Sequence, residues 1–224
     1  MSTSDQAEEP PELDAGEFTS WVTGMQAALR GEQDSDVPCG TCTGCCTSSQ
    51  FVHIAPDETD TLAHIPSILL FPAPRMPPGN VLLGYDERGH CPMLVEGACS
   101  IYAHRPRTCR TYDCRIFAAA GVALDEGEKV HIAHRSSRWE FSHPTAADRV
   151  RHDAVRAAAV FLRDHRTESD GRVIATAATP LAVFAVKVHD AFVRCDDVTD
   201  QPTLVEPDAV TVQAALTVAQ LDMG

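Results

Sequence analysis

Eight of the nine cysteines in this chain lie between residues 39 and 114. They form two runs, Cys39-x2-Cys42-x2-Cys45-Cys46 and, after a gap of 44 residues, Cys91-x7-Cys99-x9-Cys109-x4-Cys114. Two thiolates in a CxxC spacing reach one metal ion from a single turn of chain without strain. Clustered cysteines with this spacing indicate metal binding rather than simple burial. We therefore predict metal ligation by all eight: Cys39, Cys42, Cys45, Cys46, Cys91, Cys99, Cys109 and Cys114.

The spacing leaves the identity of the metal open. Two zinc sites of four thiolates each would use all eight cysteines. Alternatively, the first three cysteines match the three-ligand run of a [4Fe–4S] site, and Cys91 precedes Pro92, as the distant ligand of such a site often does. The other four thiols would then form a second site or remain open for chemistry. The sequence slightly favours an iron–sulfur cluster over zinc, and mixed ligation by His53, His90 or His104 stays possible.

A group of arginines accompanies the second cysteine run. Arg105, Arg107, Arg110 and Arg115 lie within eleven residues of one another, around two of the cysteines. Guanidinium groups lower the pKa of nearby thiols and offset the negative charge of a thiolate-bound metal. We therefore expect these arginines to support the site.

The ninth cysteine and the N-terminus indicate a reducing compartment. Cys195 stands apart, and we expect it outside the metal set as a small buried residue. The chain starts with an acidic, polar segment that has neither the basic start nor the apolar run of a signal peptide. We therefore expect a cytoplasmic protein, in which reduced thiols favour metal ligation over disulfides.

The charge pattern excludes several partners. The formal net charge is −14, but residues 1–36 and 196–224 carry all of it, and residues 37–195 are neutral. Nucleic acids and anionic membranes both require a basic face. No stretch approaches the roughly 20 apolar residues of a membrane span. We therefore expect a metal ion or cluster as a partner, leave a protein partner open, and expect neither nucleic acid nor a membrane.

The pattern of apolar residues predicts an α+β fold in which helices at both ends enclose a small, loop-rich cysteine core with short strands. The expected organisation is a disordered acidic tail at 1–10, an N-terminal helix within 11–36, a cysteine-cluster metal-binding domain at 37–140 and a C-terminal helical region at 141–224 packed on it. A capping-box pattern from Asp14 to Glu17 predicts the first helix over 15–30. Further helices are expected at 56–63, 145–165, from 179 onward and at 207–221. Strands are expected at 51–54, 80–85 and, weakly, 130–133.

These residues resemble a known family. The segment Cys39-Gly-Thr-Cys-Thr-Gly-Cys-Cys46, then Cys91-Pro-Met-Leu, Cys99-Ser-Ile-Tyr, Arg105-Pro and Cys109-Arg with a final Cys114, is similar to the CxxCxxCC (YkgJ-like) zinc- or iron-chelating domains. The resemblance covers residues 39–115 and implies metal binding through the eight cysteines. A flagellin lysine methylase is similar to this family. However, the chain lacks both the CxxxCxxC run of radical S-adenosylmethionine enzymes and a GxGxxG loop.

Three functions remain open from the sequence. The first is an iron–sulfur or zinc protein whose metal is structural or passes electrons. The second is a metal-dependent enzyme, methylase-like or redox, that uses an open metal position or a free thiolate near Cys45 and Cys46. The third is a zinc-stabilised protein-interaction module. No motif assigns a catalytic residue or an organic cofactor site.

Overall fold

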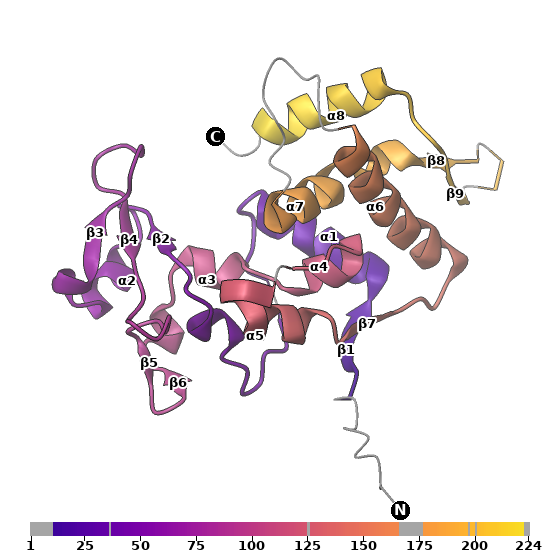
Figure 1. Ribbon diagram of the computed structural model, residues 1–224. Coiled ribbons are helices and arrows are strands. Elements are labelled where there is room, and N and C mark those ends of the chain that lie inside the picture. Colours follow the sequence, from indigo (N-terminus) through magenta and orange to yellow (C-terminus); the bar gives the residue numbers. More distant parts are fainter. Residues whose placement is uncertain are drawn as a thin grey trace, which may run out of the picture.

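The computed structural model describes residues 11–35, 37–124, 126–165, 177–196, 198–199 and 201–221. The tail predicted for residues 1–10 lies outside these ranges. Figure 1 shows the longer helices gathered in one part of the molecule, the small sheets β2–β4 and β5–β6 in another, and α3 and α5 between them. The class is α+β, as predicted.

The larger hydrophobic core is built by helices from both ends of the chain together with one parallel strand pair. Its apolar side chains include Phe18, Trp21, Phe117, Ile132 and Leu162, each at most 7% exposed. The elements around it are β1 (Leu13–Glu17), α1 (Phe18–Leu29), α4 (Arg115–Ala120), α5 (Glu126–Ser136), β7 (Trp139–Ser142), α6 (Ala146–Asp164), α7 (Ala178–Val188), η4 (His189–Phe192) and α8 (Ala209–Leu221). A short hairpin of β8 (Val193–Cys195) and β9 (Pro202–Leu204) lies beside α6.

The start of the first helix was predicted three residues too early. Residues 13–17 form β1, which pairs in parallel with β7, and Leu13 lies opposite Trp139. Asp14 accepts a hydrogen bond from the Gly16 N–H at 2.8 Å instead of capping a helix. The helix therefore begins at Phe18. Its apolar residues then recur at helical spacing on the core side, as predicted.

The later helices follow the sequence signals more closely. The predicted helix at 145–165 is α6, and its N-terminus carries a capping box between Thr145 and Asp148. The predicted weak strand at 130–133 is wrong, because this segment is part of α5. Ile132 is 1% exposed in the larger core, so tertiary packing overrides the strand preference of its β-branched residues.

A smaller core lies under a three-stranded antiparallel sheet ordered β2–β4–β3. Its buried apolar residues are Val52, Ile54, Ile65, Leu83 and Ile101. The elements around it are η1 (Gly44–Thr47), β2 (Val52–Ile54), α2 (Thr59–His64), η2 (Ser67–Leu69), β3 (Leu70–Pro72), β4 (Val81–Leu83), β5 (Leu94–Val95), β6 (Ala98–Cys99), η3 (Tyr102–His104) and α3 (Arg107–Thr111).

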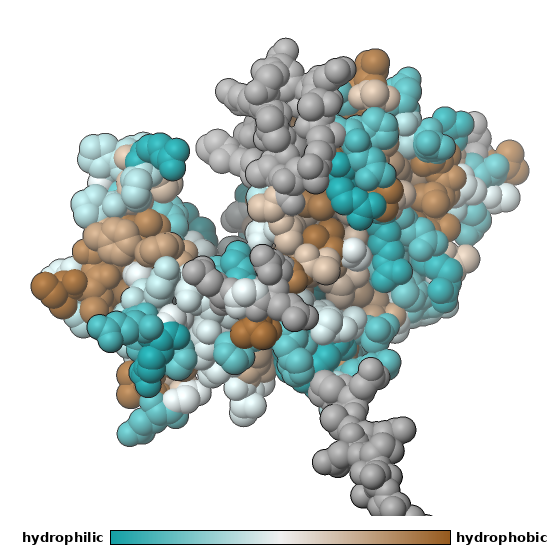
Figure 2. All heavy atoms as spheres, viewed as in Figure 1, coloured by the Kyte–Doolittle hydropathy of each residue, from teal (hydrophilic) through white to brown (hydrophobic). Residues whose placement is uncertain are grey.

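The outer surface of this sheet carries exposed aromatic residues. Phe51 contacts both Phe71 and Tyr85, with ring centroids 5.9 and 4.9 Å away. Figure 2 shows apolar atoms gathered over this part of the molecule. None of the helices in the described ranges combines the length and apolarity needed to cross a bilayer.

Candidate metal centre

All eight predicted cysteines line one cavity of about 380 Å³. The cavity lies between the two cores. Cys114 belongs to the larger core, whereas Cys91, Cys99 and Cys109 pack against the smaller one. The structure therefore brings together thiols that are up to 75 residues apart in sequence.

The electrostatic interactions between the thiols divide them into two groups. Burial is the main cause of the raised pKa of Cys45, and Cys114 and Cys39 are the thiols that contribute most after it. At Cys114, burial, the Trp139 hydrogen bond and Asp113 come first, and the contributing thiols are those of Cys39 and Cys42. We call Cys39, Cys42, Cys45 and Cys114 the first quartet. The Cys42 sulfur also accepts a hydrogen bond from the Gly44 N–H at 3.4 Å.

The other four thiols form the second quartet: Cys46, Cys91, Cys99 and Cys109. Burial is the main cause of the raised pKa of Cys46, followed by the thiols of Cys91 and Cys99 and then by those of Cys42 and Cys39. The backbone of Cys91 donates to the carbonyl of Cys46 at 2.7 Å, which fixes the two cysteines side by side. The iron–sulfur alternative in the sequence analysis grouped Cys91 with the first three cysteines. The only thiol that contributes to the raised pKa of Cys91 is that of Cys99, so we favour a different grouping here, and both groupings stay predictions.

The division falls between two consecutive residues, Cys45 and Cys46. Both lie in η1, a 3-10 helix with about three residues per turn. Neighbouring side chains in such a helix diverge by about 120°. This geometry directs Cys45 toward the first quartet and Cys46 toward the second.

The sulfur atoms lie farther apart than the ligands of a single metal ion. Across the described residues, which include all eight cysteines, no three sulfurs lie within 4.8 Å of each other. A tetrahedral zinc site with Zn–S bonds of about 2.3 Å brings its sulfurs to about 3.8 Å of one another. Binding of a single zinc ion in either quartet would therefore require the side chains to close in.

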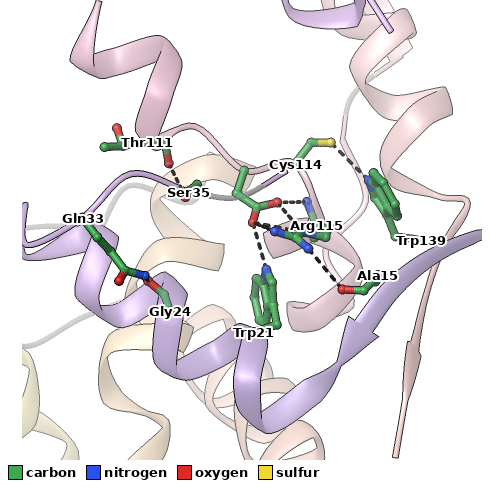
Figure 3. Close-up of polar contacts among 10 residues, drawn as sticks. Ala15, Trp21, Gly24, Gln33, Ser35, Thr111, Cys114, Arg115 and Trp139 are labelled. Atoms are coloured by element: carbon green, nitrogen blue, oxygen red, sulfur yellow. Dashed lines mark hydrogen bonds and ion pairs between the residues drawn. The ribbon is translucent and has the colours of Figure 1, made fainter. Parts of the chain in front are cut away.

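Cys114 is the only one of the nine cysteines that is buried. It is 7% exposed, and the indole Nε1 of Trp139 donates to its sulfur at 3.2 Å (Figure 3). The Arg135 guanidinium lies over the Trp139 ring, 4.7 Å from its centroid. Arg135 also donates to the carbonyl of Pro38 at 3.1 Å and so connects α5 to the start of the first cysteine run.

The residues before and after Cys114 in the sequence, Asp113 and Arg115, form a buried ion pair. Arg115 donates to both carboxylate oxygens of Asp113 at 2.8–3.0 Å and to the carbonyl of Ala15 at 3.2 Å (Figure 3). The indole of Trp21 donates to the same carboxylate at 2.9 Å. The backbone that carries Cys114 is therefore anchored to β1 and α1.

Burial raises the pKa of these thiols in the metal-free protein. The pKa is raised to about 11 for Cys46 and Cys114 and to about 12 for Cys109, with mutual repulsion between thiolates as a further cause. The Trp139 hydrogen bond opposes this rise in pKa at Cys114, and the guanidinium of Arg105 opposes it at Cys109. The thiols would therefore lose their protons as they bind a metal.

Most of the arginines predicted to support the site are engaged elsewhere. Arg107 pairs with Asp57 and Arg110 with Asp34. Arg115 pairs with Asp113 in the larger core. Arg105 alone of the four lines the cavity in the described structure, and it stacks on the ring of Tyr102 at 3.6 Å.

Three histidines were considered as additional metal ligands. None of them is among the described residues that line the cavity. His53 hydrogen-bonds Asn80 at 2.8 Å, and the backbone of His90 donates to Asp86 at 2.9 Å. His104 contacts Asp60. Cys195 ends β8 and is exposed, so its predicted burial is wrong, although it stands apart from the quartets as expected.

Residues 38–133 match the family model CxxCxxCC, described as "Putative zinc- or iron-chelating domain". Residues 38–133 therefore resemble this family, and we call them the CxxCxxCC domain. It contains both quartets and ends within α5, so the CxxCxxCC domain contributes Ile132 to the larger core. Comparisons with curated proteins and with solved structures give no match. Thiolates are soft ligands that suit zinc and iron–sulfur clusters, so the donor set fits a chelating domain.

Proposed function

We propose that the CxxCxxCC domain holds two metal centres, one in each quartet, and that both are iron–sulfur clusters. The observation that carries this proposal is the division of eight cavity-lining thiols into two sets of four. Four thiolates complete the ligand set of a [4Fe–4S] cluster, and soft sulfur donors favour such clusters.

The space between the thiols favours clusters over single zinc ions. The cavity has a volume of about 380 Å³, far more than the roughly 10–15 Å³ that a single water molecule requires by the same measure. The spread of the sulfurs also suits a group with several metal atoms better than one ion. When bound, iron–sulfur clusters supply reversible one-electron chemistry and a strong cross-link between their ligands.

The chain itself provides the positioning and the shielding from water. Apolar residues of both cores, including Val52, Leu83, Ile101 and Ile132, line the cavity. Trp139 would keep its hydrogen bond to Cys114, because a thiolate sulfur accepts such a bond. Each quartet combines ligands from the first cysteine run with ligands from the second, so the two centres would connect the 39–46 loop to the rest of the domain. We propose a primarily structural role with redox capacity.

Paired cysteine substitutions test the two-quartet arrangement. We expect Cys39→Ser/Cys114→Ser, both in the first quartet, to retain about half of the metal, since the second quartet is intact. Cys39→Ser/Cys109→Ser breaks both quartets and should lose nearly all of it. Metal is counted by mass spectrometry on anaerobically purified protein. Equal metal content in the two variants would show that the quartets are assigned wrongly.

A second measurement separates iron from zinc. Acid-labile sulfide and a brown colour with broad visible absorbance are expected in the same anaerobic samples. A colourless protein with stoichiometric zinc would refute the cluster assignment and leave two zinc sites. Alkylation of the metal-loaded protein tests the enzyme alternative: we expect labelling at the exposed Cys195 and protection of the eight quartet thiols.

A further inference from the structure

Three side chains with metal-binding groups converge on the surface near α2, apart from the thiol cavity. Asp60 and His64 lie one turn apart on α2, and His104 ends η3. One carboxylate oxygen and one nitrogen from each imidazole all lie within 4.8 Å of one another. All three side chains are reachable from solvent, with exposures of 70%, 41% and 38%.

The distances suit ligands of a common ion. His104 Nδ1 lies 2.8 Å from Asp60 Oδ2, and His64 Nδ1 lies 3.7 Å from Asp60 Oδ1. Two ligands at bond lengths of about 2.0–2.1 Å are about 3.0 Å apart at a right angle and about 3.4 Å apart in a tetrahedron. The observed separations bracket these values.

The imidazole rings need two adjustments. His64 Nδ1 lies 2.8 Å from the backbone carbonyl oxygen of Asp60 and must give up that hydrogen bond to bind an ion. The two rings also stack face to face, with centroids 3.5 Å apart and an interplanar angle of 7°. A nitrogen lone pair lies in its ring plane, so two parallel rings cannot both point at one ion. The rings must tilt apart on binding, which their exposed positions allow.

We propose that Asp60, His64 and His104 form a third metal site, open to solvent, for a divalent ion that prefers imidazole and carboxylate ligands, such as Zn²⁺ or Ni²⁺. Two imidazoles and one carboxylate suit borderline transition metals and differ in chemistry from the thiolate quartets. Three protein ligands would leave the remaining coordination positions to water.

An ion bound at this site would also stabilise part of the second quartet. His104 lies midway in sequence between Cys99 and Cys109. An ion shared by α2 and η3 would fix the segment that carries both cysteines. Occupancy of the third site is therefore expected to stabilise the smaller core.

Calorimetric titration with Ni²⁺ tests the site. The full-length protein is used with its native metal centres in place and any affinity tag removed. We expect one Ni²⁺ per chain, with binding at least about tenfold weaker in His64→Ala/His104→Ala and in Asp60→Asn. The control is His165→Ala, which removes an exposed histidine on the C-terminal side of α6 and should bind as the wild type does.

A structural readout locates the ion independently. Paramagnetic Ni²⁺ should broaden the ring NMR signals of His64 and His104 first, and the melting temperature should rise in the wild type but not in the double variant. Unchanged affinity in the double variant or in Asp60→Asn would overturn the proposal. So would an equal loss in His165→Ala, broadening centred elsewhere, or thiolate-to-nickel charge-transfer absorbance, because each would place the ion at other groups.

Discussion

Trp139 donates its indole N–H to the sulfur of Cys114 across 3.2 Å. The tryptophan belongs to β7, which pairs with the first strand of the chain, so this bond connects the first quartet to the larger core. The second quartet packs against the smaller core instead. The two quartets are therefore supported by different parts of the fold, and the predictions below use that difference.

Trp139→Phe should weaken the first quartet selectively. A buried hydrogen bond contributes about 1 kcal/mol, so loss of metal from this quartet to a chelator should become about fivefold faster while the second quartet is unaffected. Metal release is followed over time by absorbance. Trp21→Phe is the matched control, because Trp21 donates to Asp113 rather than to sulfur. Equal acceleration in both variants would indicate a general loss of stability instead.

Asp113→Asn should destabilise the whole protein. The side chains of Asp113 and Arg115 are only 2% and 10% exposed, and the substitution leaves the guanidinium without its charge partner. Breaking a buried pair in this way costs about 3–5 kcal/mol of unfolding free energy, measured by urea denaturation. Asp57→Asn breaks an exposed pair with Arg107 and should have little effect. A similar, small effect of both changes would contradict the structural role of the buried pair.

His152 should make the protein less stable below neutral pH. Its ring stacks on Phe18 at 4.2 Å, and burial, assisted by Arg156 and His143, lowers its pKa to about 3. An unfolded histidine has a pKa of about 6.5, so below that value the unfolded state binds a proton that the folded state does not. The contribution of His152 to the free energy of unfolding is fully present above pH 6.5. It falls by about 1.4 kcal/mol per pH unit as the pH drops toward 3.

Comparison of variants isolates this contribution from the acid sensitivity of the thiolates. Urea unfolding of His152→Phe between pH 7 and pH 5 should show a shallower decline than the wild type. His165→Ala should follow the wild type, because this histidine lies exposed at the C-terminal end of α6. Parallel curves for wild type and His152→Phe would show that His152 already carries a proton in the folded state.

Metal removal should loosen the smaller core before the larger one. The smaller core buries five apolar side chains, whereas the larger core draws on six α-helices and a strand pair. Hydrogen exchange of the metal-free protein should therefore rise in β2, β4 and α3 while α6 and α7 keep their protection. If exchange is unchanged throughout after chelation, the proposed structural role of the metal is wrong.

The sequence predicted which thiols gather but not how they divide. Clustering and CxxC spacing selected the eight cysteines that line the cavity. The partition depends on the turn of η1 and on the distant placement of Cys114 by its buried neighbours, and a linear spacing contains neither. Similarly, His104 could be considered as a ligand, but its partner Asp60 is 44 residues away and only the packing of α2 against η3 brings them together.

The prediction of the fold from the sequence was limited in the same way. Helices with a capping box or a clear apolar stripe, such as α6, were predicted with nearly correct ends. The β1–β7 pair was missed because its residues are about 125 apart and Asp14 resembles a helix cap. Part of the helix α5 was predicted as a strand because Val130 and Ile132 are β-branched and favour extended structure. Packing against the larger core outweighs this preference.

The direct link between Cys45 and Cys46 couples the two quartets mechanically. A rotation about the φ or ψ angle between their Cα atoms that draws one sulfur inward also moves the other, since the two cysteines are adjacent in the chain. Assembly of the first centre would therefore pre-order the second, and the two would fill cooperatively rather than independently. A single residue inserted between Cys45 and Cys46 would break that mechanical link while keeping every ligand.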